Sequence, residues 1–428
     1  MLVCDTSGPA PAPPRRVRMA ERESPSFFSR YRNEFGLVIA ILVVLGITIL
    51  VNQDYLRDPM RNMRDILQET SLLGIFTLGA AVVIIAGGID LSAGSVILFS
   101  ASVCALIPYM LGPVDANGIP ISKQASSIVV CLGIGAAIFT GFLIGTFHTW
   151  LITIIRLPPF VATLATLVGL RSLAKTMNSA VTSALGNQTT TLDAKAALFS
   201  DLRVWWMPLV IFLVLGVLFW ILMNRTVIGR HLYAMGGNEE AARLSGINTD
   251  RLKWLAYSIG SITASIAGVL YAAKVSTCNP STMAVGYELN AIAAAVVGGC
   301  GLQGGTGLIP GVMLGVLFLQ IVVDAVAKVV KSGSDDWKGL IVGFLVVLAV
   351  AFNEIRRGGS TGQKRLLPGA IGWVTAPLLS LIAGLVVFVA DTKHRPAIGG
   401  TVAGISLALL IIRKMMEDAA ANRSSRPQ

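Results

Sequence analysis

Long apolar runs follow one another along most of the chain, and they restrict its fold more than any other feature. A helix needs about 20 apolar residues to cross the hydrocarbon core of a bilayer. The runs predict spans at residues 35–51, 66–86, 94–111, 126–147, 159–177, 204–223, 253–273, 289–300, 306–327, 339–353, 370–390 and 396–412. The run at 289–300 is short and ends in glycines, so both a span and a broken or re-entrant helix are consistent with it.

The composition agrees with a membrane protein. Only 13% of the 428 residues are charged and 54% are hydrophobic, whereas soluble domains carry roughly 25% charged residues. The net charge of +11 comes mainly from Lys and Arg in short segments between the runs, where they meet lipid headgroups and set orientation. Because no basic face or nucleic-acid motif occurs, we predict membrane lipid and not nucleic acid as a partner.

The charge distribution also predicts an orientation. Residues 1–34 are rich in Pro and Arg and lack the apolar core of a signal peptide, so we interpret them as a disordered cytoplasmic tail. With this tail inside, the inner segments carry more Lys and Arg than the outer segments do. We therefore predict a multi-pass protein of the plasma (inner) membrane with both termini in the cytoplasm.

Nothing in the sequence indicates a catalytic, metal or cofactor site. The five Cys form no CxxC pair and the three His lie far apart, so neither a metal site nor a disulfide framework is expected. The chain also lacks a GxxxxGK[ST] phosphate loop, a nucleophile elbow and an HExxH motif. We expect a transport subunit that is not an enzyme, with ATP and Mg²⁺ bound on a separate subunit.

The longest basic segment between runs, residues 224–253, contains a short predicted helix. It has an N-cap residue, two carboxylates in the first turn and a glycine at the C′ position. The residues of this element are Asn238, Glu239, Glu240, Ala241, Ala242, Arg243 and Gly246. Glu239 and Arg243 are spaced to pair. A helix this short needs a surface to dock on, and its residues alone do not decide between its own protein and a partner.

This segment, which runs Gly-Gly-Asn-Glu-Glu-Ala-Ala-Arg-Leu-Ser-Gly-Ile over 236–247, resembles the cytoplasmic coupling loop of ABC importer permeases. It is most similar to the ribose/xylose-type monosaccharide importer family. Other segments resemble the same family in the same order, at residues 88–95, 157–166, 293–299, 302–307 and 338–343. The resemblance covers residues 30 to 357 and implies about ten core helices in a type II, vitamin B12-importer-like arrangement.

The resemblance also implies partners and a function. The chain would form the transmembrane pathway for a monosaccharide, together with an ABC ATPase subunit, an extracytoplasmic sugar-binding protein and a second permease copy. The coupling helix would dock on the ATPase. Alternatives are an ABC permease for inositol, a nucleoside or a signalling sugar, an ion-coupled secondary transporter, and a membrane-embedded enzyme. The nearly charge-free spans argue against ion coupling, and no catalytic constellation supports an enzyme.

Four residues are candidates for the pathway or its gate. Asp90 is acidic and lies close to hydrocarbon, which suggests a transport role, although its place before Leu91 also suits a helix N-cap. Phe160 follows two prolines at a helix start and is a candidate for a cytoplasmic gate. Asn290 and Gln303 lie in and after the short run at 289–300.

The expected organisation has four parts. Residues 1–34 form the tail, 35–357 the permease core, 358–369 a basic cytoplasmic linker, and 370–428 a C-terminal two-span extension and tail. Glycines recur inside the runs, and we interpret their spacing as close helix packing in lipid. They are Gly133, Gly135, Gly141 and Gly145 in one run, and Gly307, Gly311 and Gly315 in another.

Overall fold

The computed structural model divides the chain into two compact units, residues 1–349 and 350–428. It describes residues 32–51, 57–116, 121–186, 189–329, parts of 339–347 and 373–381, and 396–424. The predicted spans at 339–353 and 370–390 fall largely outside the described residues. In the second unit, helix α16 (Pro396–Ser424) contains the predicted span at 396–412.

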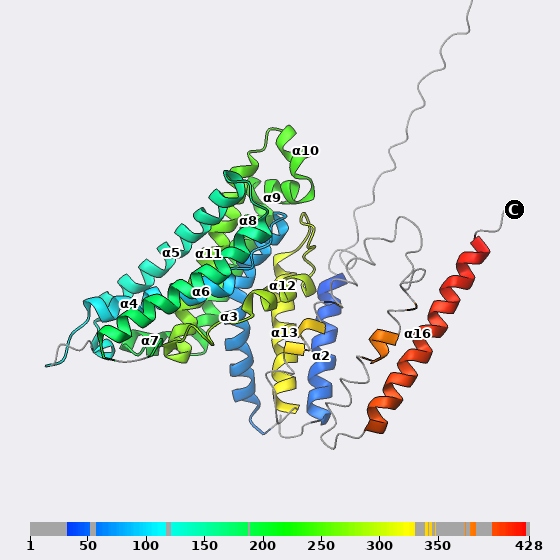
Figure 1. The fold of residues 1–428 in the computed structure, drawn as a ribbon, viewed down its shortest axis with the longest axis horizontal. Coiled ribbons are helices and arrows are strands. Elements are labelled where there is room, and N and C mark those ends of the chain that lie inside the picture. The colour runs from blue at the N-terminus through cyan, green and yellow to red at the C-terminus, as the bar shows by residue number, and fades with distance from the viewer. Residues whose placement is uncertain are drawn as a thin grey trace, which may run out of the picture. The chain divides into compact units, whose positions relative to one another are not determined.

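Helices form nearly all of the first unit (Figure 1). The long helices are α2 (Arg32–Val51), α3 (Pro59–Ile85), α4 (Ala93–Leu111), α5 (Ser127–Thr153), α6 (Pro159–Ala184), α8 (Trp206–Arg225), α11 (Thr249–Val275) and α13 (Ile309–Val329). Within the described residues, seven helices are long and apolar enough to cross a membrane, namely α3, α4, α5, α6, α8, α11 and α13. The predicted all-α membrane fold is confirmed.

Short elements connect these helices. They are η2 (Ser122–Gln124), α7 (Ala197–Leu202), α9 (Val227–Gly237), α10 (Glu239–Leu244) and α12 (Tyr287–Val297). Two-residue strands β1 (Leu192–Asp193) and β2 (Thr277–Cys278) pair antiparallel. The 11 residues of α12 extend about 16 Å at 1.5 Å per residue, well short of the roughly 30 Å hydrocarbon core. The sequence left open whether this run spans, and the helix is too short to do so.

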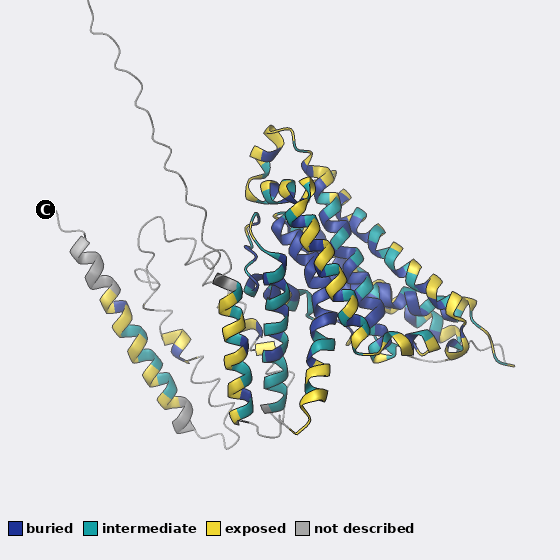
Figure 2. Cartoon of the chain, turned by 180° about the vertical axis from the view of Figure 1, so that it is seen from behind, coloured by how far each residue is buried: buried dark blue, intermediate teal, exposed yellow. Residues whose placement is uncertain are grey.

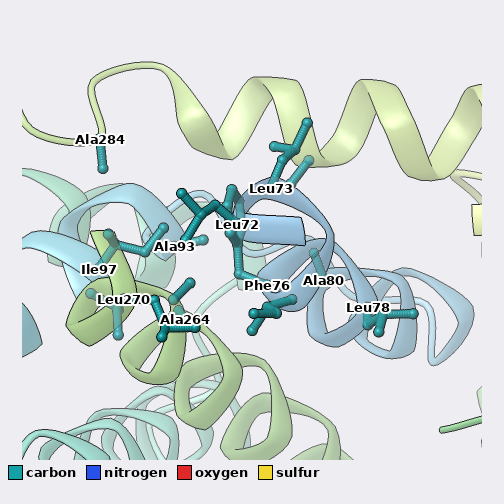
Figure 3. Packing of buried hydrophobic residues seen from close by; sticks show 14 of the residues in the cluster. Leu72, Leu73, Phe76, Leu78, Ala80, Ala93, Ile97, Ala264, Leu270 and Ala284 are labelled. Atoms are coloured by element: carbon teal, nitrogen blue, oxygen red, sulfur yellow. The ribbon is translucent and has the colours of Figure 1, made fainter. Parts of the chain in front are cut away.

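Helices α3 and α11 form the centre of the first unit. In their most apolar windows 89% of α3 and 72% of α11 is buried, against 22% of α6. Helix α11 packs on α3, α4 and α5. Figure 3 shows Phe76 of α3, Ile97 of α4 and Ala264 of α11 meeting in this core. Exposed residues lie on the outer helices (Figure 2), whose apolar faces suit lipid.

Glycines bring α5 and α11 into backbone contact. A Cβ atom at Gly145 would lie 2.5 Å from the Ser258 Cα atom and 2.7 Å from the Tyr257 carbonyl oxygen. Gly141 is equally crowded, whereas Gly135 has nothing within 4 Å. In α13, Gly315 packs on α12, since its Cβ atom would lie 2.6 Å from the Gly298 nitrogen. The packing interpretation is confirmed for Gly133, Gly141, Gly145, Gly311 and Gly315. It is wrong for Gly135, and for Gly307, which lies in the turn before α13 with φ +148°.

We expect Gly145→Ala to lower the free energy of unfolding by about 1–3 kcal/mol, because the added methyl group forces two helix backbones apart. Gly135→Ala on the same helix is the control. It should leave stability unchanged or raise it by up to about 1 kcal/mol, through higher helix propensity. Thermal unfolding of the detergent-solubilised protein measures both, and equal midpoints for the two variants would contradict the packing argument.

Candidate functional site

The predicted coupling segment folds into α10 with both of its predicted caps. The Asn238 Oδ1 atom accepts a hydrogen bond from the Ala241 N–H at 3.0 Å. At the other end, Gly246 has φ +84°, a conformation that glycine adopts without strain. The Gly246 N–H donates to the Arg243 carbonyl at 3.0 Å, and the Ile247 N–H donates to the Ala242 carbonyl at 3.1 Å. These two bonds form a Schellman motif that closes the helix.

The predicted ion pair between Glu239 and Arg243 is wrong. Arg243 pairs with Glu240 within α10, and Glu239 pairs with Lys253 of α11. Lys253, near the start of α11, lies beside Glu239 and pairs with it. Arg243 pairs instead with Glu240, three residues before it on α10. The Glu239–Lys253 pair therefore connects α10 to the central helix α11.

Helix α10 has one buried contact and one exposed apolar side chain. Ala242 is 5% exposed and packs on the protein, whereas Leu244 is 81% exposed. Figure 1 shows α10 at one end of the first unit, beyond α9. Leu244 is the last residue of a helix that is capped at both ends, so its side chain is held on a fixed element. Ala242 therefore packs this helix on its own protein, and docking on a partner stays a prediction.

Helix α9, directly before α10, was missed by the sequence analysis. The Thr226 hydroxyl caps it by accepting the Gly229 N–H at 3.1 Å. Leu232 and Met235 are buried along one face. The signal was present in the sequence as an N-cap threonine before apolar residues at helical spacing. The sequence analysis instead interpreted this basic stretch as part of a loop.

Three glycine-containing segments meet at the C-terminal end of α9, and we call their contact the glycine junction. It consists of Ile85 and Gly87 at the end of α3, Gly236 in α9, and Gly304 and Gly305 in the turn between α12 and α13. The Gly305 N–H donates to the Ile85 carbonyl at 2.9 Å. A Cβ atom at Gly236 would lie 2.6 Å from the Gly305 nitrogen, and one at Gly304 would lie 2.6 Å from the Gly236 oxygen. Only glycine allows this approach of three backbones.

A tyrosine fastens α9 to the same turn. The Tyr233 hydroxyl donates to the Gly307 carbonyl at 2.7 Å. Burial raises the pKa of Tyr233 to about 12, and the neighbouring Cys300 thiol adds to this effect. The phenol therefore stays protonated and keeps its donor at physiological pH. The end of α9 is thus held by one side-chain bond as well as by the glycine junction.

Asp90 is enclosed by the protein. It is 6% exposed, and its Oδ1 atom accepts the Ser92 N–H at 2.8 Å and the Ser92 hydroxyl at 2.6 Å. The predicted N-cap role is wrong, because Ser92 occupies the N-cap of α4 and the Asp90 carboxylate closes the turn before it. Its transport role stays a prediction.

The other pathway candidates lie on separate elements. Phe160 is 51% exposed in the first turn of α6, and Gln303 is exposed in the turn between α12 and α13. Asn290 lines a cavity of about 800 Å³ between α3, α12 and α13, and it is the only one of the four candidates that does. No cluster of His, Cys, Asp or Glu suited to a metal ion occurs in the part of the chain that the structure describes.

Bundled apolar spans, the short helix α12 beside a cavity and the capped helix α10 are the arrangement expected of an integral membrane permease. Comparison with known families agrees, because residues 62–350 match the family described as branched-chain amino acid transport system, permease component. The chain belongs to this family. The matched residues contain α13 and nearly all of α3, and they end close to the boundary between the two units.

Two of the following relatives are named as sugar import permeases, and the third is named only as a probable ABC transporter permease. The ribose import permease protein RbsC of Escherichia coli is 32% identical over 66% of this chain and 82% of the relative. The galactose/methyl galactoside import permease protein MglC of Escherichia coli is 28% identical over 77% and 96%. A probable ABC transporter permease protein of Sinorhizobium fredii is 32% identical over 82% and 97%. No solved structure matches the chain.

We expect Gly236→Ala to break the glycine junction and to lower the free energy of unfolding by about 1–3 kcal/mol, because the methyl group overlaps two neighbouring backbones. Gly237→Ala is a matched control, since a Cβ atom there has nothing within 4 Å. Thermal unfolding of the purified protein compares the two. A Gly236→Ala variant as stable as Gly237→Ala would show that the junction is looser than described.

Proposed function

We propose that this chain is the permease subunit of an ATP-binding-cassette importer and forms the transmembrane pathway for a monosaccharide of the ribose or xylose type. The match to permeases named for ribose and galactose import supports the solute class. A type II arrangement of about ten core helices is part of this proposal. Inositol, a nucleoside and a signalling sugar are other small polar solutes that such a permease would serve.

The observation that carries the proposal is the capped helix α10 with Leu244 exposed at its tip. In the proposed complex, residues Asn238–Gly246 dock on a separate ATPase subunit, which binds ATP and Mg²⁺. Movement of α10 then reaches α11 through the Glu239–Lys253 pair and reaches α3 and α13 through the glycine junction. A capped helix transmits such a displacement, whereas a flexible loop would absorb it.

The site of the ATPase sets the orientation in this proposal. The end of the bundle that carries α10 is cytoplasmic, as are both chain termini, in the plasma (inner) membrane. The opposite end then faces an extracytoplasmic sugar-binding protein, which delivers the solute. The ATPase supplies the energy, and this chain supplies the pathway.

Helix α6 supports a second permease copy in the complex. Although α6 is apolar enough to span, it has the lowest mean hydropathy of the seven spans, at 1.2. Ser172, Lys175 and Thr176 lie exposed along it. Polar side chains at membrane depth need a protein or water contact, and a second copy, with the pathway between the two, would supply both.

We expect Leu244→Asp to reduce ATP-dependent uptake of radiolabelled D-ribose, D-xylose or D-galactose about tenfold. The change places a charge in the proposed apolar contact, and a tenfold loss corresponds to ~1.4 kcal/mol of docking free energy. Uptake is measured in proteoliposomes that hold the permease, its ATPase and its binding protein, and co-purification of the ATPase reports assembly.

The control is Leu111→Asp, because Leu111 is 60% exposed at the end of α4 that lies away from α10. The ATPase should co-purify with this variant as it does with the unmodified complex. If Leu244→Asp left both assembly and uptake unchanged, α10 would not be the element that couples the permease to its ATPase.

A further inference from the structure

The cavity between α3, α12 and α13 has features of a solute site. Its volume of about 800 Å³ lies within the range of small-molecule pockets. Gln320, on α13, lines it about 16 Å along the helix from Ile309, and Glu69, on α3, lines it about 24 Å from Ile85, at 1.5 Å per residue. The cavity therefore lies away from the glycine junction, towards the end of the bundle that faces outward in the proposed orientation.

Two side-chain amides in this cavity have no partner within the protein as described. Asn290, on α12, and Gln320, in the middle of α13, both line the cavity. No hydrogen bond joins either side chain to another described residue. An amide at membrane depth without a hydrogen bond costs free energy. Water or a polar solute inside the cavity would supply hydrogen bonds to the two amides.

The charges around the cavity favour a neutral solute. Among the described residues that line it, Glu69 is the only charged one, and it pairs with Lys274 of α11. An amino acid would need a cation for its carboxylate and an anion for its ammonium group. Sugar hydroxyls both donate and accept, as amides do. The lining thus fits a neutral polyhydroxylated molecule better than a zwitterion.

One wall of the cavity is a fixed aromatic ring. Tyr287 lines the cavity and stacks on Phe76 with ring centroids 6.0 Å apart. Its hydroxyl bonds to the Tyr271 hydroxyl at 3.3 Å. The ring is therefore held from two sides and presents a rigid surface next to Asn290, three residues further along α12. Amides beside a rigid aromatic surface suit a sugar ring, which has polar edges and apolar faces.

We propose that this cavity, within a single permease subunit, is a transient binding site for the transported sugar, with the Asn290 and Gln320 amides as its hydrogen-bonding groups. This inference rests on the proposed function, because it assigns a place along the pathway to the imported sugar. A subunit-internal site would hold the sugar before or after the passage between two copies.

Thiol accessibility tests whether the cavity is wet and whether it holds sugar. Gln320→Cys is made in a Cys131→Ser background, because Cys131 is exposed, and the assembled complex in proteoliposomes is treated with a cationic methanethiosulfonate. The control is Val217→Cys, on the apolar face of α8, where Val217 is 58% exposed. We expect Gln320→Cys to react at least tenfold faster than the control.

The second part of this experiment tests whether a sugar in the cavity protects the thiol from labelling. D-ribose, D-xylose and D-galactose are tested at millimolar concentration, and at least one of them should slow the labelling of Gln320→Cys several-fold, whereas L-valine should not. Labelling no faster than at Val217→Cys, or protection by L-valine alone, would overturn the proposal. Labelling needs no transport, so its result tests the sugar site independently of the proposed import function. If no sugar enters the liposomes, the proposed function fails, whether or not Gln320→Cys reacts.

Uptake by substituted complexes is the second measurement. Gln320→Leu removes the amide at nearly constant volume and should lower sugar uptake about tenfold while the ATPase still co-purifies. Gln320→Asn retains an amide and should recover part of the uptake. The control is Met313→Leu, on α13, whose side chain faces Gly216 of α8; its uptake should match the unmodified complex. Equal uptake by Gln320→Leu and Met313→Leu would count against the site.

Discussion

The backbone contact at the glycine junction is the constraint on which the rest of this permease depends. Three segments far apart in sequence come into backbone contact there, because glycines stand at positions 87, 236, 304 and 305. The bond from the Gly305 N–H to the Ile85 carbonyl joins the most buried helix, α3, to the turn that begins α13. Gly236 brings α9, and with it α10, to the same point. Helix α10 and two of the helices that line the cavity, α3 and α13, are therefore connected at the same point.

Close packing takes the place of hydrophobic association within the bundle. Lipid tails are as apolar as leucine, so helices in a bilayer gain little by burying apolar surface against each other. The helices associate instead through small residues and buried hydroxyls. Gly145 allows α5 to touch α11, and the Ser100 and Ser265 hydroxyls join α4 to α11 at 2.7 Å. This explains why α11 carries many small residues along a span of moderate hydropathy.

Features set by neighbouring residues were predictable from the sequence, whereas contacts between distant segments were not. Apolar runs located the spans, and local cap preferences located both ends of α10, at Asn238 and Gly246. The partner of Glu239 could not be predicted, because Lys253 belongs to another helix. Asp90 was misplaced as an N-cap, because its carboxylate bonds Ser92 outside the helix. Glycines occur after α3, in α9 and after α12, but no local pattern indicates that these three segments touch one another.

The two closed ends of α10 affect the speed of a transport cycle. An uncapped segment that ordered only on docking would lose conformational entropy at each turnover, at about 1–2 kcal/mol per residue. In α10 the Asn238 side chain and the Schellman bonds of Gly246 and Ile247 hold the helix within the permease itself. Docking and release then require no folding step. In the proposed cycle, refolding of the contact between subunits would therefore not slow docking or release.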